Sequence, residues 1–158
     1  MATLAEPSAM ELVKPLYHSG PPIYDTLGPE VADLNDFIGY GPDPEQEMIL
    51  DAIFALDEEG RSQSFEIMFE APRQNLKTGV MKQALIGWMF LTQENLMMWT
   101  AHEFATAQEA FRDVQIMIED APVLKRRVDR YRFKSGAEGI ELNYGGRVMF
   151  RSRTAVGG

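Results

Sequence analysis

The chain has 158 residues, 45% of them hydrophobic, which suits one domain with a buried core. It contains no cysteine, and its two histidines, His18 and His102, lie far apart, which excludes disulfides and metal sites built from clustered Cys or His. No apolar run approaches the roughly 18 residues of a membrane span, and no basic segment followed by an apolar one opens the chain, so we expect neither a membrane helix nor a signal peptide.

The net charge of −9 argues against general nucleic-acid binding, but the charges are unevenly distributed. Residues 1–122 contain 6 Lys/Arg and 21 Asp/Glu, a balance of −15, whereas residues 123–158 contain 9 and 3, a balance of +6. Such asymmetry can mark an edge that faces a polyanion. The basic segment can also simply neutralise the acidic remainder, and both interpretations stay open.

The N-terminal region is rich in proline and glycine. Residues 1–28 show little periodicity, so we expect an extended or disordered arm there, with the folded part in residues 29–158. A short helix is predicted from Pro29 to Ile38. A second helix is predicted after Asp43, because Asp43 is an N-cap type, Pro44 suits the first helical position and Gln46 completes a capping box.

The central region alternates strand-like and helix-like segments. The apolar run Phe65–Glu70 predicts a core strand, and the apolar run Val80–Leu91 predicts a buried helix. Residues 95–100 predict a buried parallel strand. Thr100 and Glu103 then predict a capping box for a long helix. Strand, helix, strand and helix in this order favour a parallel sheet with helices on its faces.

The segment Ala71–Gly79 joins the first predicted strand to the first predicted helix, which is the layout of a phosphate-binding P-loop. In such a loop, backbone N–H groups surround phosphate oxygens, a lysine reaches the β/γ-phosphates, and a Ser or Thr hydroxyl binds Mg²⁺. Lys77 and Thr78 hold those two places. Ala71 and Leu76 stand where the usual pattern has glycine, so a plain polar turn remains an alternative.

The C-terminal region predicts short strands. Residues 131–134 form one strand candidate, and residues 140–143 and 147–150 alternate around Tyr144-Gly145-Gly146, which predicts a β-hairpin. The predicted fold class is therefore α/β, with a P-loop NTPase-type parallel sheet, flanking helices and a hairpin near the C-terminus.

The loop also resembles a known family. Pro-Arg-Gln-Asn-x-Lys-Thr at residues 72–78 resembles the variant Walker A loop of large terminase subunits from tailed bacteriophages and prophages, which more often carry Gly where Leu76 stands. The resemblance covers roughly residues 40–158. It continues through Gly87-Trp88, Trp99-Thr100-Ala101-His102, Thr106-Ala107-Gln108-Glu109 and Phe150-Arg151-Ser152-Arg153-Thr154-Ala155.

The resemblance implies an ATPase site that binds ATP and Mg²⁺. Lys77 and Arg73 would be its catalytic residues, with Arg73 contacting the γ-phosphate, and Thr78 would be the metal ligand. Gln46 resembles a glutamine that contacts the adenine base, although a capping role explains it equally well. The nucleotide-binding set would be Gln46, Arg73, Gln74, Asn75, Leu76, Lys77, Thr78 and Gly79.

The acidic Walker B motif of this family has no counterpart here, because neither Asp57-Glu58-Glu59 nor Glu119-Asp120 ends a strand after the loop. The resemblance places that motif just past Gly158, so we expect the N-terminal part of a larger protein that also carries a nuclease domain. On this view the segment alone hydrolyses ATP poorly or not at all. Arg151 and Arg153 are candidates for an arginine finger or for DNA contact, or are simply exposed charges of a hairpin.

The resemblance further implies a DNA-packaging motor in the bacterial host cytoplasm, at the portal of the procapsid. Its partners would be double-stranded DNA, the small terminase subunit, the capsid portal and further copies in a ring. Two alternatives remain from the residues themselves. One is another P-loop motor of helicase type, and the other is a non-catalytic interaction domain with a degenerate loop. A catalytic role for His102 is less favoured than a structural one.

Overall fold

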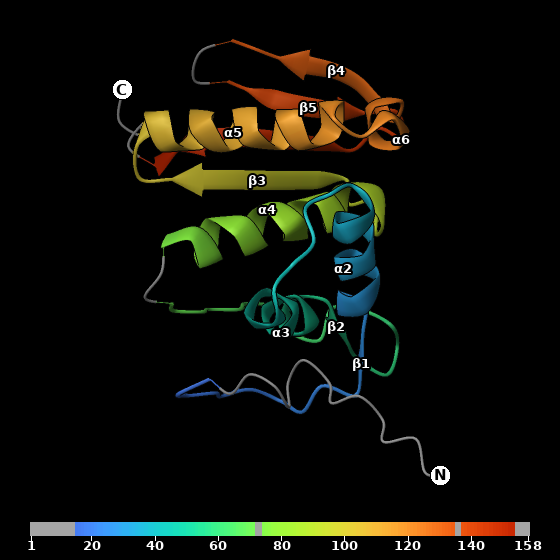
Figure 1. Cartoon of the computed structure of the whole chain (residues 1–158), viewed down its shortest axis with the longest axis vertical. Helices are drawn as coiled ribbons and strands as arrows, with labels where there is room; N and C mark the ends of the chain where they lie inside the picture. Colours follow the sequence, from blue (N-terminus) through green and yellow to red (C-terminus); the bar gives the residue numbers. More distant parts are fainter. Residues whose placement is uncertain (1–14, 72–73, 135–136, 154–158) are drawn as a thin grey trace. The chain divides into compact units, whose positions relative to one another are not determined.

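The computed structural model describes residues 15–71, 74–134 and 137–153, with the backbone alone for residues 74 and 75 (Figure 1). The protein is mixed α/β, and it divides into two compact units, residues 1–84 and 85–158. Within the described ranges, no helix is both long enough and apolar enough to cross a membrane.

In its described residues, the first unit contains two short strands and two short helices, followed by the start of a longer helix. Strand β1 (Asp25–Thr26) pairs antiparallel with β2 (Ala55–Leu56). Helices α2 (Gly28–Phe37) and α3 (Pro44–Ile53) lie between these strands in the sequence and pack on each other. Helix α4 (Gln74–Phe90) begins in this unit and ends in the second. Both short helices are confirmed, and residues 25–26, near the end of the predicted arm, form β1.

The predicted capping box of α3 is confirmed. The Asp43 side chain accepts a hydrogen bond from the Gln46 N–H at 2.9 Å, and the Asp43 N–H donates to Gln46 Oε1 at 3.0 Å. Two backbone N–H groups at the start of the helix thereby find acceptors in residues only three positions apart. The capping box could be predicted from the sequence because all of its residues are close together in the chain.

The start of α2 lies directly against α3. Thr26 Oγ1 donates to the Asp51 carbonyl at 2.8 Å and accepts from the Gly28 N–H at 3.0 Å. A Cβ atom built on Gly28 would lie 2.2 Å from Asp51 Oδ1 and 2.7 Å from Asp51 Cα. Because one of these atoms belongs to the backbone of α3, a side chain at position 28 would push the two helices apart.

We therefore expect Gly28→Ala to lower the free energy of unfolding by about 1–3 kcal/mol, the usual cost of overpacking. Urea unfolding at pH 7 measures it. Gly20→Ala is the matched control, because a Cβ there meets only a ring carbon of His18 at 3.9 Å. Equal stabilities for the two variants would contradict the close approach of α2 to α3.

The second unit is a four-stranded mixed sheet with α5 (Phe104–Glu119) packed on β3 and β6 (Figure 1). Strands β3 (Leu96–Ala101), β4 (Val128–Arg132), β5 (Gly139–Leu142) and β6 (Arg147–Ser152) lie in the order β3-β6-β5-β4. The short helix α6 (Pro122–Lys125) separates α5 from β4. Strands β3 and β6 are parallel, and the other two pairs are antiparallel. The predicted hairpin is confirmed as β5 and β6, joined through Gly145 with φ at 97°.

The core of this unit lies between α5 and one face of the sheet. Phe150 on β6 is 1% exposed, makes an edge contact with Phe111 of α5 at 5.3 Å, and stacks with Trp99 of β3 at 6.2 Å between ring centroids. On β3, Met97 is buried while Met98 is 58% exposed. The predicted parallel strand is therefore present, but it is buried on one face only.

Two sequence-based predictions for the central region are wrong. Residues 65–70 form no strand, because their backbone pairs with no described strand. The side chains of Phe65 and Met68 are exposed. Thr100 does not cap α5, because it still belongs to β3, where it pairs with Arg151. Glu103 takes the N-cap position instead, without a side-chain hydrogen bond. The predicted strand at residues 131–134 exists but begins earlier, at Val128.

Candidate functional site

The first turns of α4 hold the residues predicted for phosphate binding. The helix begins at Gln74, so Leu76, Lys77, Thr78 and Gly79 are helical. Lys77 and Thr78 are exposed, and Leu76 is half-buried. The segment predicted as a loop is thus helical from its fourth residue onward. Lys77 and Thr78 are therefore both exposed to solvent near the start of α4.

Part of the predicted site is not described. Arg73 lies outside the described residues, as does Pro72, and the side chains of Gln74 and Asn75 lie outside them too. Backbone N–H groups in the first turn of a helix lack partners inside the helix and form its positive end. An anion at this end would meet the N–H groups of the first turn, because those of Thr78 and Gly79 come after it and bond within the helix.

Gln46 lies beside Gly79, although the two residues belong to different helices. A Cβ atom built on Gly79 would lie 2.6 Å from Gln46 Nε2. The Gln46 amide therefore packs directly against the backbone of α4, one residue after Thr78, at a position that only glycine leaves open. The structure thus brings together two residues that were predicted separately for the nucleotide site.

A buried amide network supports this contact, and it was not predicted. Gln83 is 5% exposed, and its Nε2 donates to the Tyr40 carbonyl at 3.0 Å and to Gln46 Oε1 at 3.3 Å. Asn35 is fully buried, and its Nδ2 donates to the carbonyls of Val31 at 2.8 Å and Gln83 at 3.2 Å. The sequence signal was weak, because Gln83 follows Lys82 in the mainly apolar stretch of α4 and does not stand out as a buried polar residue.

The side-chain oxygens of this network are incompletely paired. Gln83 Oε1 and Asn35 Oδ1 are buried and accept no hydrogen bond within the described ranges. A buried polar atom without a partner costs roughly 1–3 kcal/mol, so such atoms mark places where function outweighs stability or where a water completes the network. Gln83 bonds Gln46 to α4, and Asn35 bonds α2 to the Gln83 carbonyl of the same helix.

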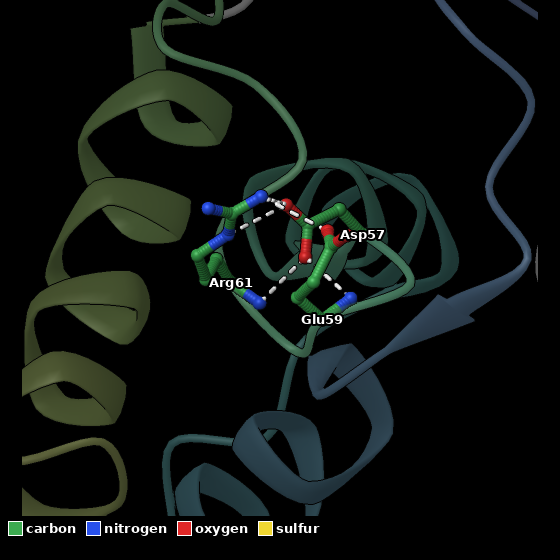
Figure 2. Close-up of polar contacts among 3 residues, drawn as sticks. All are labelled: Asp57, Glu59 and Arg61. Atoms are coloured by element: carbon green, nitrogen blue, oxygen red, sulfur yellow. Dashed lines mark hydrogen bonds and ion pairs between the residues drawn. The ribbon is translucent and has the colours of Figure 1, made fainter.

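The acidic stretch before the loop has a structural role. Figure 2 shows that Asp57, Glu59 and Arg61 form a closed turn. Asp57 Oδ1 accepts from the backbone N–H of Glu59 at 3.0 Å and of Arg61 at 2.8 Å, and the Arg61 guanidinium pairs with both carboxylates. These hydrogen bonds, above all the one from the Arg61 N–H, lower the pKa of Asp57. The carboxylates are engaged within their own turn, which agrees with the interpretation that they are not the acidic catalytic motif.

Carboxylates with lowered pKa values occur in both units, and they predict sensitivity to acid. The guanidinium of Arg130, followed by that of Arg132, lowers the pKa of Glu141 as the Arg61 N–H lowers that of Asp57. Such groups stabilise the fold fully above their ordinary pKa values of 3.8 and 4.5, and this stabilisation is lost as the pH falls through the lower folded values.

The pKa of Asp51 is shifted in the opposite direction. Burial, then the charges of Glu47 and Glu30, raise its pKa, so its charge costs stability above the folded pKa and the cost disappears on protonation. Because more groups have lowered values, we expect the free energy of unfolding to fall between about pH 5 and pH 2. Urea unfolding at pH 7, 4.5 and 3 measures this fall. Asp57→Asn should make the fall smaller, and an equal fall in that variant would contradict the assignment.

The other candidate residues lie in the second unit. Arg151 is half-buried, and its Nη1 donates to the carbonyls of Glu138 at 3.1 Å and Phe150 at 2.7 Å. Arg153 is exposed at the end of the described chain. His102 is exposed between the end of β3 and the start of α5. The Arg151 guanidinium is therefore bonded to backbone carbonyls, and Arg153 is the more exposed of the two arginines.

Metal binding by carboxylate or imidazole clusters has no support in the part of the chain that the structure describes, where no three His, Asp or Glu side chains are placed so that they could hold a metal ion. A magnesium ion at Thr78 would depend on one hydroxyl together with nucleotide oxygens and water, which is how Mg²⁺ is commonly held. No family model matches the chain, and comparisons with curated proteins and with solved structures found no similar protein.

Proposed function

We propose that the chain is the nucleotide-binding part of a DNA-packaging motor of the large-terminase type, and that it binds Mg²⁺-ATP at the start of α4. The observation that carries this proposal is the contact between Gln46 Nε2 and Gly79 beside the exposed Lys77 and Thr78. Gln46 contacts the second turn of α4, and Lys77 and Thr78 are exposed near the start of the same helix, whose positive end favours anions.

Each residue of this site has a definite task in the proposal. Lys77 neutralises charge on the β- and γ-phosphates, and the N–H groups of the first turn of α4 bind phosphate oxygens. The Thr78 hydroxyl holds Mg²⁺, which when bound neutralises further phosphate charge. Gln46 contacts the base. Arg73, which lies outside the described residues, is assigned to the γ-phosphate by the family resemblance alone.

The resemblance also supplies the larger setting of the proposal. Hydrolysis of ATP, on a P-loop NTPase-type fold, would drive double-stranded DNA into a capsid in the bacterial cytoplasm. The chain would work in a ring of copies together with the small terminase subunit and the capsid portal. The basic balance of residues 123–158 favours a partner of negative charge on that side of the sequence.

A second candidate is a non-catalytic interaction domain, which two observations favour. Helix α4 already begins at Gln74, so part of the segment that would have to wrap around phosphates is helical. Residues 65–70 are also not paired as the strand that precedes a P-loop. Both features are compatible with a chain that carries a P-loop-like sequence motif but does not bind nucleotide.

Isothermal titration calorimetry of the 158-residue chain with Mg²⁺-ATP separates the two candidates. We expect saturable binding with one site per chain, weakened when Mg²⁺ is replaced by a chelator. Absence of heat at millimolar nucleotide, in a protein whose circular dichroism shows it folded, would reject the nucleotide site and favour the interaction domain.

A further inference from the structure

The orientation of the Gln46 amide is fixed by a backbone group. The Asp43 N–H can only donate, so the Gln46 atom that faces it at 3.0 Å is the oxygen, Oε1. The Gln83 amide is fixed in the same way. The Tyr40 carbonyl can only accept, so the Gln83 atom that faces it at 3.0 Å is the nitrogen, Nε2.

These two orientations determine what Gln46 can offer to a ligand. A carboxamide oxygen accepts two hydrogen bonds, and Gln46 Oε1 already accepts from the Asp43 N–H and from Gln83 Nε2. Gln46 Nε2 carries two hydrogens and donates to no acceptor in the described part of the chain, where it lies against Gly79. On the side that faces Gly79 of α4, the Gln46 amide is therefore a hydrogen-bond donor only.

A donor alone cannot distinguish adenine from guanine. An amide that recognises adenine donates to N7 and accepts from the 6-amino group, which takes both ends of the amide. Guanine presents acceptors at both N7 and O6. A donor-only amide can bind N7 of either base, and its second hydrogen suits O6 of guanine rather than the amino group of adenine.

We propose that Gln83 is a positioning residue that occupies Gln46 Oε1 and thereby makes the site accept purine nucleotides through N7 without a preference for adenine. The inference rests on the proposed function, because it concerns the base of a nucleotide whose phosphates bind the start of α4. It specifies the ligand class as purine nucleoside triphosphates, GTP included.

The unmodified chain provides the first test. Calorimetric titrations use the Mg²⁺ complexes of ATP, GTP, 7-deaza-ATP and tripolyphosphate. We expect the affinity for GTP to lie within threefold of that for ATP or above it. We expect 7-deaza-ATP, which lacks the N7 acceptor, to bind about 3–10-fold more weakly, as does tripolyphosphate.

The outcomes separate this inference from the proposed function. Binding of ATP more than threefold tighter than GTP, or equal binding of ATP and 7-deaza-ATP, overturns the inference and leaves the nucleotide site standing. Binding of none of the four compounds overturns the proposed function, and the inference with it.

Gln83→Met is the second test, because methionine keeps the length of the side chain and removes its hydrogen bonds. With Oε1 of Gln46 released from one donor, we expect the preference for ATP over GTP to rise about 3–10-fold. Gln115→Met, on α5 in the other unit, should leave the ratio unchanged. An unchanged ratio of ATP to GTP affinity in a folded Gln83→Met protein overturns the role of Gln83. If that variant does not fold, the titrations of the unmodified chain still test the inference.

Discussion

Replacing Lys77 by alanine is expected to weaken Mg²⁺-ATP binding by about 10–100-fold, because a hydrogen bond to a charged group contributes roughly 1.5–3 kcal/mol. Lys77 is exposed in the first turns of α4, where the positive end of the helix also favours phosphate. The same exposure predicts little cost in stability, within about 0.5 kcal/mol, since surface substitutions in helices usually change little. Loss of binding without loss of stability would assign the lysine to the ligand.

The measurement is isothermal titration calorimetry with Mg²⁺-ATP, accompanied by urea unfolding of each variant. Lys82→Ala is the matched control, because it removes the same charge from the same helix five residues later. We expect its affinity to stay within twofold of the unmodified chain. Equal weakening in both variants would mean that the helix acts through its overall charge, and unchanged affinity in Lys77→Ala would place any nucleotide elsewhere.

The sequence predicted the features that depend on neighbouring residues. Asp43 and Gln46 form the capping box because their partners lie within one turn of helix. The hairpin of β5 and β6 was predicted because its turn contains Gly145, whose positive φ suits glycine. Helices α2, α3 and α5 lie where helices were predicted, and the apolar run from Val80 marked the later part of α4, which begins at Gln74. In each of these cases the structure follows from local geometry.

The predictions that failed depend on pairing between distant segments. The apolar run in residues 65–70 is strand-like, but a strand also requires a neighbouring backbone, and the composition of one segment carries no information about that partner. Thr100 has the composition of a cap, but its pairing with Arg151 keeps it in β3. Tertiary pairing outweighed the local signal at both places.

The candidate site shows the same division. Lys77 and Thr78 could be predicted as site residues from the sequence motif of one segment, whereas the contact of Gln46 with Gly79 is made by two separate helices. Gln83 could not be named at all, because its partners are a backbone carbonyl in the loop after α2 and a side chain of α3. The hydrogen bond from Gln83 to Gln46 is thus visible only in the folded chain.

Replacing Phe150 by alanine is expected to have the largest effect on stability, a loss of about 3–5 kcal/mol in the free energy of unfolding. Phe150 is 1% exposed, and its ring touches Phe111 of α5 and Trp99 of β3. Its removal leaves a cavity where the helix packs on the two parallel strands, and the residues around the cavity relax only partly. Since a domain is stable by only about 5–15 kcal/mol, this loss can unfold the second unit.

Urea unfolding followed by tryptophan fluorescence measures this effect, because Trp99 stacks on the ring that is removed. Phe133→Ala is the matched control. Phe133 also contacts Phe111, at 5.8 Å between ring centroids, but it is 66% exposed, so we expect a loss below about 1 kcal/mol. If the two substitutions cost the same, the core of this unit does not lie between α5 and the β3–β6 pair. A large loss for Phe150→Ala alone would support that packing.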